Sequence, residues 1–187
     1  MDPIESLMHE HRMIERLMNV LNESMRRIEA GAEVDVDLFE KAIDFIKNFA
    51  DRCHHMKEEG ELFVIFAQKG IPDQGGPIGM MLNEHHIGRD YVRGMEEGLR
   101  RHKSGDRSQA QVLVQNARGY INLLSQHIMK EDNILYPMGN RLLSNADRKK
   151  LISRFEEIET EDIGEGVHEK YHHLIEDLEN RIGLAHE

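Results

Sequence analysis

Two ten-residue segments decide the fold of this 187-residue chain: HHMKEEGELF at residues 54–63 and HIMKEDNILY at residues 127–136. They align at an offset of 73 residues, and in each a His precedes a Glu by four positions. That spacing places two side chains one above the other on the same face of a helix. Each segment therefore predicts a helix that aims an imidazole and a carboxylate at one point. The two pairs are His54 with Glu58 and His127 with Glu131.

A second repeat lies upstream of each of these segments. Residues 3–30 and 77–103 both carry apolar residues at spacings of three and four, the pattern of a helix with one buried face. His11 interrupts the first apolar stripe and His85 interrupts the second, at an offset of 74, and each follows a Glu. The chain is therefore predicted to contain two copies of a helical hairpin.

Glycine and proline divide the chain into long segments rich in good helix formers. Asp37, Ser144 and Glu165 stand near expected helix starts, and Asp106 is the expected N-cap of a helix that begins at Arg107. We predict an all-α fold in which residues 1–140 form an up-down-up-down four-helix bundle and residues 141–187 form an appendage of one or two helices that packs on it. The predicted helices span residues 3–30, 36–69, 77–103, 107–139, 144–158 and 165–184.

Composition excludes several classes of protein. The chain has 35 acidic and 24 basic residues, a formal charge of −11, and no basic stripe, which argues against a nucleic-acid partner. Its one cysteine, Cys53, cannot build a disulfide framework and suits a reducing compartment. Charges among the first twelve residues disfavour a signal peptide, and nowhere do about 18 uncharged apolar residues run together. We expect a cytoplasmic protein without a membrane partner.

One inward His from each remaining helix completes a set of six candidate metal ligands. Burying imidazoles and carboxylates in an apolar bundle costs several kcal/mol per unpaired charge unless cations compensate them. These donors suit Fe, Mn or Zn, and a bundle core with Glu and His on facing helices is a usual setting for di-iron sites. A single inward His, or a single pair of His and Glu, has an ordinary structural explanation, but four elements in register favour a metal site. The set is His11, His54, Glu58, His85, His127 and Glu131.

The tandem residues in the first segment leave one pairing open. His55 with Glu59 has the same spacing as His54 with Glu58. An α-helix rotates about 100° per residue, which gives each side chain a direction around the helix axis. The apolar residues between 39 and 53 point on average about 100° away from His54 and nearly opposite to His55, which favours His54 as the inward residue. Glu58 fits this apolar face less well. The choice of His54 and Glu58 therefore depends mainly on the repeat.

These motifs resemble the hemerythrin-like, HHE cation-binding family. The resemblance covers about residues 1–140, and its motifs are EH at 10–11, HHMKEEGELF at 54–63, MLNEHHIGR at 81–89 and HIMKEDNILYP at 127–137. It implies a four-helix bundle around two Fe ions bridged by an oxo or hydroxo group and by Glu58 and Glu131, with the same six residues as ligands. Members of the family bind O2 or related small molecules and serve in oxygen transport, sensing, iron homeostasis, nitric-oxide response and peroxide handling.

The sequence departs from the oxygen-carrying hemerythrins at one position. Those proteins have two His four residues apart on the third helix, whereas the residue four positions after His85 is Arg89. In the C-terminal appendage, His168 begins a stripe that repeats the pattern of His11, which makes it a candidate seventh ligand. It is equally open that His168 only caps the bundle through a hydrogen bond, or that the neighbouring His172 takes its place.

The expected function is that of a non-haem di-iron protein that binds O2, NO or peroxide, served by a redox partner. Mn or Zn are expected substitutes for iron. An iron- or oxygen-responsive regulatory module, in which metal occupancy exposes or hides the appended helices, would carry the same residues. A di-iron enzyme that handles peroxide or NO would also carry these residues, as would a structural bundle with a His-rich core.

Overall fold

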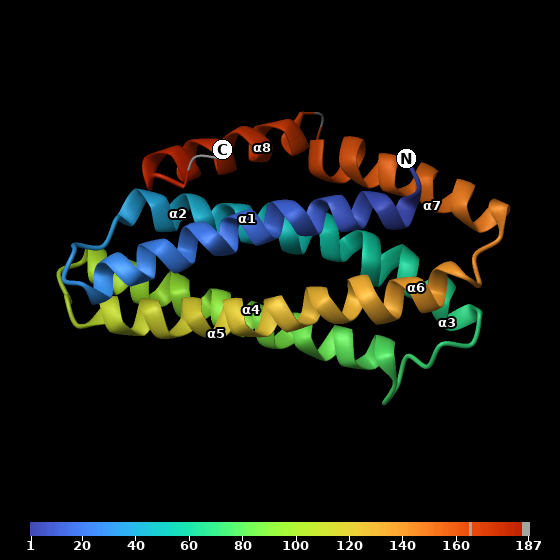
Figure 1. Ribbon diagram of the computed structural model, residues 1–187, viewed down its shortest axis with the longest axis horizontal. Coiled ribbons are helices and arrows are strands. Elements are labelled where there is room, and N and C mark those ends of the chain that lie inside the picture. The colour runs from blue at the N-terminus through green and yellow to red at the C-terminus, as the bar shows by residue number, and fades with distance from the viewer. Residues whose placement is uncertain (165, 185–187) are drawn as a thin grey trace.

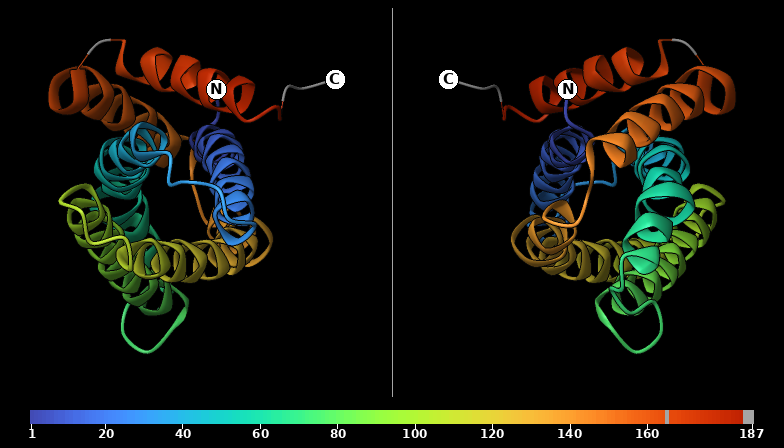
Figure 2. Two further views of the ribbon diagram at one scale, coloured as in Figure 1. Left: turned by 90° about the vertical axis from the view of Figure 1, so that its left-hand side faces the viewer. Right: turned by 90° about the vertical axis from the view of Figure 1, so that its right-hand side faces the viewer.

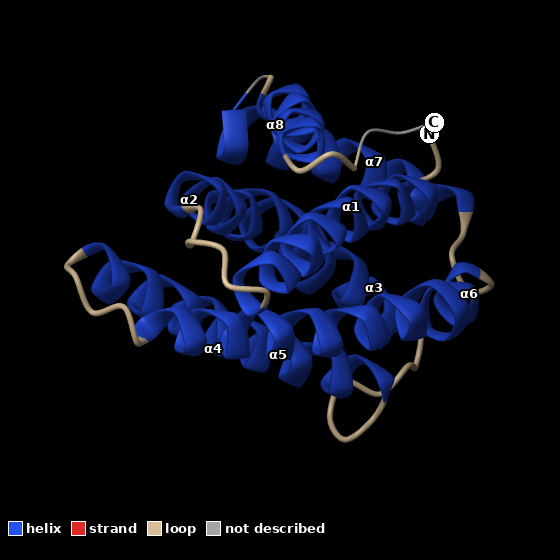
Figure 3. Ribbon diagram, turned by 60° about the vertical axis from the view of Figure 1, so that its left-hand side comes forward, coloured by secondary structure: helices blue, strands red, loops and turns tan. Residues whose placement is uncertain are grey.

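A computed structural model describes residues 1–164 and 166–184, and within these ranges the chain is helical with no strand (Figure 3). The all-α prediction is confirmed. The label η marks π-helical segments, in which the backbone hydrogen bonds join residues five apart. The elements are α1 (Pro3–Glu29), α2 (Val36–Phe45), η1 (Ile46–His55), η2 (Glu58–Leu62), α3 (Phe63–Gln68), α4 (Pro77–Lys103), α5 (Gln109–Lys130), η3 (Glu131–Leu135), α6 (Tyr136–Asn140), α7 (Asn145–Glu157), η4 (Ile158–Gly164) and α8 (Val167–Arg181).

The helices run back and forth along the long axis of the molecule (Figure 1). The path goes out along α1, returns through α2, η1, η2 and α3, goes out again along α4 and returns through α5, η3 and α6. End-on views show these four lengths of helix around a common interior, with α7 and α8 outside it (Figure 2). The outer pair packs on α1 and α2, and η4 contacts η1.

Side-chain caps account for the starts of α1, α2 and α7. Asp2 accepts a hydrogen bond from the backbone N–H of Ile4 at 3.0 Å, with Pro3 as the first residue of α1. Ser144 and Asp147 form a reciprocal capping box at the start of α7, where Ser144 was the expected start. The cap of α2 is Asp35, which accepts from the backbone N–H of Leu38, and Asp37 lies in the first turn.

The start predicted at Asp106 is wrong. The helix α5 begins at Gln109, because residues 106–109 form a separate turn after Gly105, whose φ is 105°. The carboxylate of Asp106 accepts from the side chains of Ser108 and Gln109 and from the backbone of Ser108, all within that turn. The start expected at Glu165 lies outside the described residues.

The apolar core consists of two clusters with a buried polar layer between them. On α1, Leu7 belongs to one cluster and Met13 to the other, and His11 lies between them in sequence. On the return path, Ile128 and Leu135 belong to different clusters in the same way, with Glu131 between them. The core therefore places the candidate ligands midway along the bundle, away from solvent at both ends.

The appended helix α8 shares this core. Its residues Tyr171, Ile175 and Leu178 belong to the same apolar cluster as α1 and α2, and the Tyr171 hydroxyl donates to Asp44 at 2.9 Å. Arg16 of α1 donates to both carboxylate oxygens of Glu179, at 2.9 and 2.6 Å. The described helices include none that is long and apolar enough to cross a membrane.

Candidate metal centre

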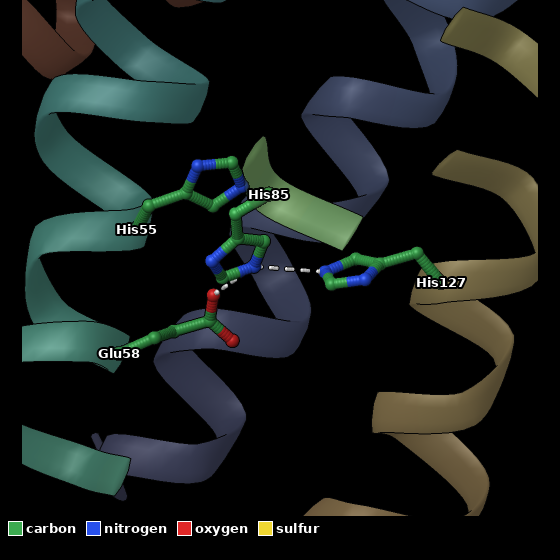
Figure 4. Close-up of side chains that lie close together, drawn as sticks. All are labelled: His55, Glu58, His85 and His127. Carbon is green, nitrogen blue, oxygen red and sulfur yellow. Dashed lines mark hydrogen bonds and ion pairs between the residues drawn. The ribbon is translucent and has the colours of Figure 1, made fainter. Parts of the chain in front are cut away.

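Seven buried residues form two adjacent groups of possible metal ligands. In each group, one donor atom from every residue lies within 4.8 Å of the others. Glu58 belongs to both groups, so the two groups meet at this residue. Figure 4 shows Glu58 with the three His residues of one group. The first group is His11, His54, Glu58 and Glu131, and the second is His55, Glu58, His85 and His127.

Both carboxylates lie between imidazoles of the two groups. Oε2 of Glu131 is 3.2 Å from Nε2 of His11 and 3.2 Å from Nε2 of His127. Oε2 of Glu58 is 3.6 Å from Nε2 of His54 and 3.5 Å from Nε2 of His85. Each carboxylate thus reaches one His of each group, the arrangement needed to bridge two cations.

The backbone repeats along with the side chains. The segments η2 and η3 lie 73 residues apart and each begins at the bridging Glu, Glu58 or Glu131. Single π-helical turns inside α-helices are rare and occur frequently at functional sites. The structure thus carries the internal repeat that the sequence indicated.

A layer of carboxylates orients all five imidazoles. Each Nδ1–H can donate to a carboxylate, which leaves the Nε2 lone pair directed into the centre, as in carboxylate–histidine–metal arrangements. The contacts are His11 with Asp132 at 2.7 Å, His54 with Glu10 at 2.8 Å, His55 with Asp51 at 3.0 Å, His85 with Glu59 at 2.7 Å and His127 with Glu84 at 2.9 Å.

Cations in turn hold this carboxylate layer. Arg89, at the position where oxygen-carrying hemerythrins have a His, donates to Asp51 and Glu59 at 2.8 Å each. The other contacts are Arg12 with Asp132, Lys57 with Glu10 and Lys130 with Glu84. Lys57 is completely buried and also contacts Glu159 of η4 at 2.5 Å.

The repeated motif therefore gives a structural role to each charged residue in it. In each hairpin the Glu of the EH pair contacts both the His and the Lys of the downstream segment: Glu10 contacts His54 and Lys57, and Glu84 contacts His127 and Lys130. The acid after the bridging Glu crosses to the other hairpin, Glu59 to His85 and Asp132 to His11. Sequence analysis did not assign these outer carboxylates, although their recurrence in the repeat was the available signal.

Several buried polar atoms at the centre have no hydrogen-bond partner within the described structure. They are Nε2 of His11, Oε2 of Glu58 and both oxygens of Glu131. Nε2 of His11 is near Glu131 but is not aligned for a hydrogen bond. Leaving such a group buried and unpaired costs about 1–3 kcal/mol, and more when it is charged. The unsatisfied donor set therefore fits cations between the two groups.

Without cations, protons balance the charges of the centre. Burial and the negative charge of Glu131 raise the pKa of Glu58 well above its ordinary value. Burial opposes ionisation of Glu131 too, but His127 and His11 outweigh it and hold the pKa of Glu131 well below the ordinary value. Burial lowers the pKa of His127, but Glu131 and Glu84 outweigh it and raise that pKa to about 9. The metal-free centre thus keeps a proton on Glu58 and another on His127.

The second group contains His55, which sequence analysis considered only as an alternative to His54. The structure brings both residues into the centre, with the His55 ring stacked on His85 at 3.7 Å between centroids. Periodicity placed His55 on the far side because it assumed about 100° per residue, whereas η1 is π-helical and turns less per residue. Glu59, the partner in the alternative pairing, faces outward from the centre and contacts Nδ1 of His85.

His168 lies elsewhere, so the expectation of a seventh ligand there differs from the structure. Its Nε2 is 3.1 Å from Glu10, and its side chain is 38 % exposed. Because α8 packs on the outside of α1 and α2, Glu10 lies between His168 and His54, and the seventh residue of the two groups is His55. His168 belongs to a third, separate group of possible ligands with Glu10 and Cys53. His172 is also outside the centre, exposed and 3.2 Å from Glu176.

The fold and this site define a helical-bundle metal-binding protein, and the comparisons with known proteins specify its family. The Hemerythrin HHE cation binding domain matches residues 2–139, so the chain belongs to that family.

Among curated proteins, the uncharacterized protein Rv1995 of Mycobacterium tuberculosis (strain H37Rv) and the uncharacterized protein Mb2018 of Mycobacterium bovis are each 22% identical over 181 residues. These alignments cover 96% of this chain and 70% of each relative. No solved structure matches the chain.

Metal uptake by the metal-free protein should depend on pH. Metal ligands must be deprotonated, and His127 with its pKa of about 9 holds a proton at neutral pH. We expect the apparent affinity for Zn²⁺ to rise as pH increases toward 9 and to level off above it, with protons released on binding below pH 9. Competition titrations with a chelating dye measure the affinity. An affinity that stays constant between neutral pH and pH 9 would contradict this assignment.

Two alanine variants test whether His55 or His168 is the seventh metal ligand. His55→Ala removes one of the three imidazoles of the second group, so we expect it to lose about half of the bound metal. His168→Ala removes contacts to Glu10 and to the Phe49 ring but no member of either donor group, so we expect its metal content to equal that of the unmodified protein. Metal analysis of both variants after identical loading is the measurement. Equal metal loss in both variants, or loss only in His168→Ala, would restore His168 as a ligand.

Proposed function

We propose that this protein is a non-haem di-iron protein of the hemerythrin-like type, with an up-down-up-down bundle, that binds O2 or a related small molecule such as NO or peroxide. The observation that carries the proposal is the pair of donor groups joined by two carboxylates with unpaired oxygens directed between them. Iron, and Mn or Zn as substitutes, accept imidazole and carboxylate donors of this kind.

The two metals would have unequal sets of donors. His11 and His54 would hold one, His55, His85 and His127 would hold the other, and Glu58 and Glu131 would bridge them. The asymmetry comes from the sequence: His55 of the first copy corresponds, 73 residues later, to Ile128 of the second. The two-imidazole group is therefore one donor short, and an added small molecule would complete it. Bound iron would supply reversible electron transfer at that position.

Tyr136 is the protein group that distinguishes the two-imidazole side. Its ring is stacked parallel to His11, 5.5 Å between centroids, and its hydroxyl donates to Oε1 of Glu58. At the equivalent position of the first copy, Phe63 is stacked on His85 at 6.2 Å and carries no hydroxyl. Burial and the nearby carboxylates raise the pKa of Tyr136 well above its ordinary value, so the hydroxyl keeps its proton and its hydrogen bond to Glu58.

The surrounding core covers the centre at both ends of the bundle. All seven donors are buried, and apolar clusters close both ends of the layer that contains them. An apolar shell around a metal site controls solvent access and tunes the redox potential of a metal inside it. This supports a role with O2, NO or peroxide as the ligand.

Metal content and an optical spectrum test the proposal. Purified protein reconstituted anaerobically should bind two irons per chain and show absorption bands that change with O2, NO or azide. Glu131→Ala should lose metal and thermal stability together, because metal bound at 100 times its Kd stabilises the folded state by about 2.7 kcal/mol. Glu97→Ala, at an exposed Glu paired with Arg100, is the matched control. Failure of the purified protein to take up iron would refute the proposal. Steady consumption of peroxide or NO would show that the protein is an enzyme and not a carrier.

A second candidate function is that of a metal-responsive regulatory module. The observation that favours it is the contact between the appended helices and the centre: Lys57 contacts both Glu10 and Glu159, and His168 also contacts Glu10. Glu10 in turn orients His54. A metal bound at His54 would therefore affect Glu10, whose contacts with Lys57 and His168 hold η4 and α8 to the bundle.

Hydrogen exchange distinguishes this candidate from a simple carrier. If the appendage responds to metal, amides of η4 and α8 should exchange at least ten times faster in metal-free protein than in loaded protein. Lys57→Met should abolish that difference, because it removes the link between Glu10 and Glu159. Arg181→Met removes a contact of α8 with Asp35 and Asp37, far from the centre in sequence, and serves as control. Equal exchange with and without metal would exclude the regulatory role.

A further inference from the structure

A cavity of about 190 Å³ lies beside the second donor group. Its walls come from η1, α4 and α5, and its inner end is formed by His55, His85 and His127. The rest of the interior is mainly apolar. The lining residues there are Ile46, Gly88, Val92, Tyr120, Leu123 and Leu124.

The cavity is larger than a diatomic ligand requires. An engineered apolar cavity of about 150 Å³ in another protein binds benzene, so this one has room for a six-membered ring. Gly88 keeps that room free in the middle of α4, although glycine is a poor helix former. A Cβ atom at Gly88 would meet Leu123 and Tyr120 at 3.8 Å, an ordinary contact, so neither packing nor backbone conformation requires glycine there.

The charged residues around the cavity are already paired. Arg89 contacts Asp51 and Glu59, and Lys47 contacts Glu96 at 2.6 Å across the space between η1 and α4. In the same way Arg93 contacts Asp90, and Glu84 contacts Lys130. An ionic ligand would therefore find no unpaired partner among these lining residues. A neutral ligand fits the cavity better.

One polar group on the wall lacks a partner. Tyr120 is 3 % exposed, and its hydroxyl makes no hydrogen bond to any residue that the structure describes. Burial and the charge of Asp51 raise the pKa of Tyr120, so the hydroxyl remains a donor. The hydroxyl oxygen is not among the fully buried polar atoms without a partner, so it is accessible from the cavity that Tyr120 lines, and an acceptor inside the cavity would receive its hydrogen bond.

We propose that this cavity binds a neutral, largely apolar molecule about the size of a six-membered ring, with one hydrogen-bond acceptor that receives the Tyr120 hydroxyl and an apolar part near His55, His85 and His127. The proposal goes beyond the proposed function, because O2, NO or peroxide would leave most of this space empty. It concerns a separate space from the two-imidazole side of the centre, where Tyr136 lies.

Two probes of the same shape test it. Cyclohexanone carries an acceptor, and methylenecyclohexane is its hydrocarbon counterpart. Isothermal titration calorimetry on the full chain, with metal content measured in every sample, should detect binding of both probes. Tyr120→Phe should weaken cyclohexanone about five-fold, which corresponds to a hydrogen bond of about 1 kcal/mol, and should leave methylenecyclohexane unchanged.

Gly88→Leu should fill the cavity and abolish binding of both probes. Ile87→Leu places the same residue type next to it on the exposed side of α4 and should change neither. Gly88→Ala, which adds only one methyl group in ordinary contact, provides a folded variant with partly reduced binding if the leucine disturbs packing. Absence of cyclohexanone binding to the unmodified protein, or full binding by folded Gly88→Leu, would overturn the proposal. Probe binding by protein that takes up no iron would refute only the di-iron function.

Discussion

The need to neutralise two buried glutamates among five buried histidines determines most of this structure. Glu58 and Glu131 are completely buried, and the oxygens that face the centre have no hydrogen-bond partner in the described structure. Such groups are tolerated only with compensating positive charge, from protons or from metal ions. The five outer carboxylates fix the imidazoles, the surrounding Lys and Arg residues fix those carboxylates, and two apolar clusters pack at the two ends of this polar layer.

Duplication explains how a chain of this length assembles so many partners. The same short motif supplies, in each copy, a bridging Glu, an inward His, a Lys that anchors the neighbouring EH pair, and an acid that crosses to the other hairpin. The π-helical turns recur at the same place in both copies. The two copies differ at two positions beside the donors. The first copy has His55 where the second has Ile128, and Phe63 where the second has Tyr136. These differences give one donor group three imidazoles and the other two, with a hydroxyl beside the second.

Sequence patterns were sufficient for the helices and for the six donors that the structure brings together, because periodicity and the repeat report which residues share a face. The same patterns did not identify His55 as an inward residue. A π-helical segment changes the rotation per residue, and the composition of residues 46–55 does not indicate that they form one. His168 was expected at a core-facing position; it faces the bundle and contacts buried Glu10, but its side chain is 38 % exposed. Periodicity does not specify how far α8 lies from the centre. Glu10 of α1 lies between His168 and His54. The cavity beside Tyr120 depends on the side-chain packing of three separate elements, which no local pattern encodes.

The most direct test of the central claim is anomalous diffraction at the iron absorption edge from crystals of iron-loaded protein. Two bridged ions predict two peaks about 3.5–4 Å apart, as in other two-metal sites, one at His11 and His54 and the other at His55, His85 and His127. Glu58 and Glu131 should lie between the peaks. A single peak, or a peak at the group formed by Glu10, Cys53 and His168, would contradict the account.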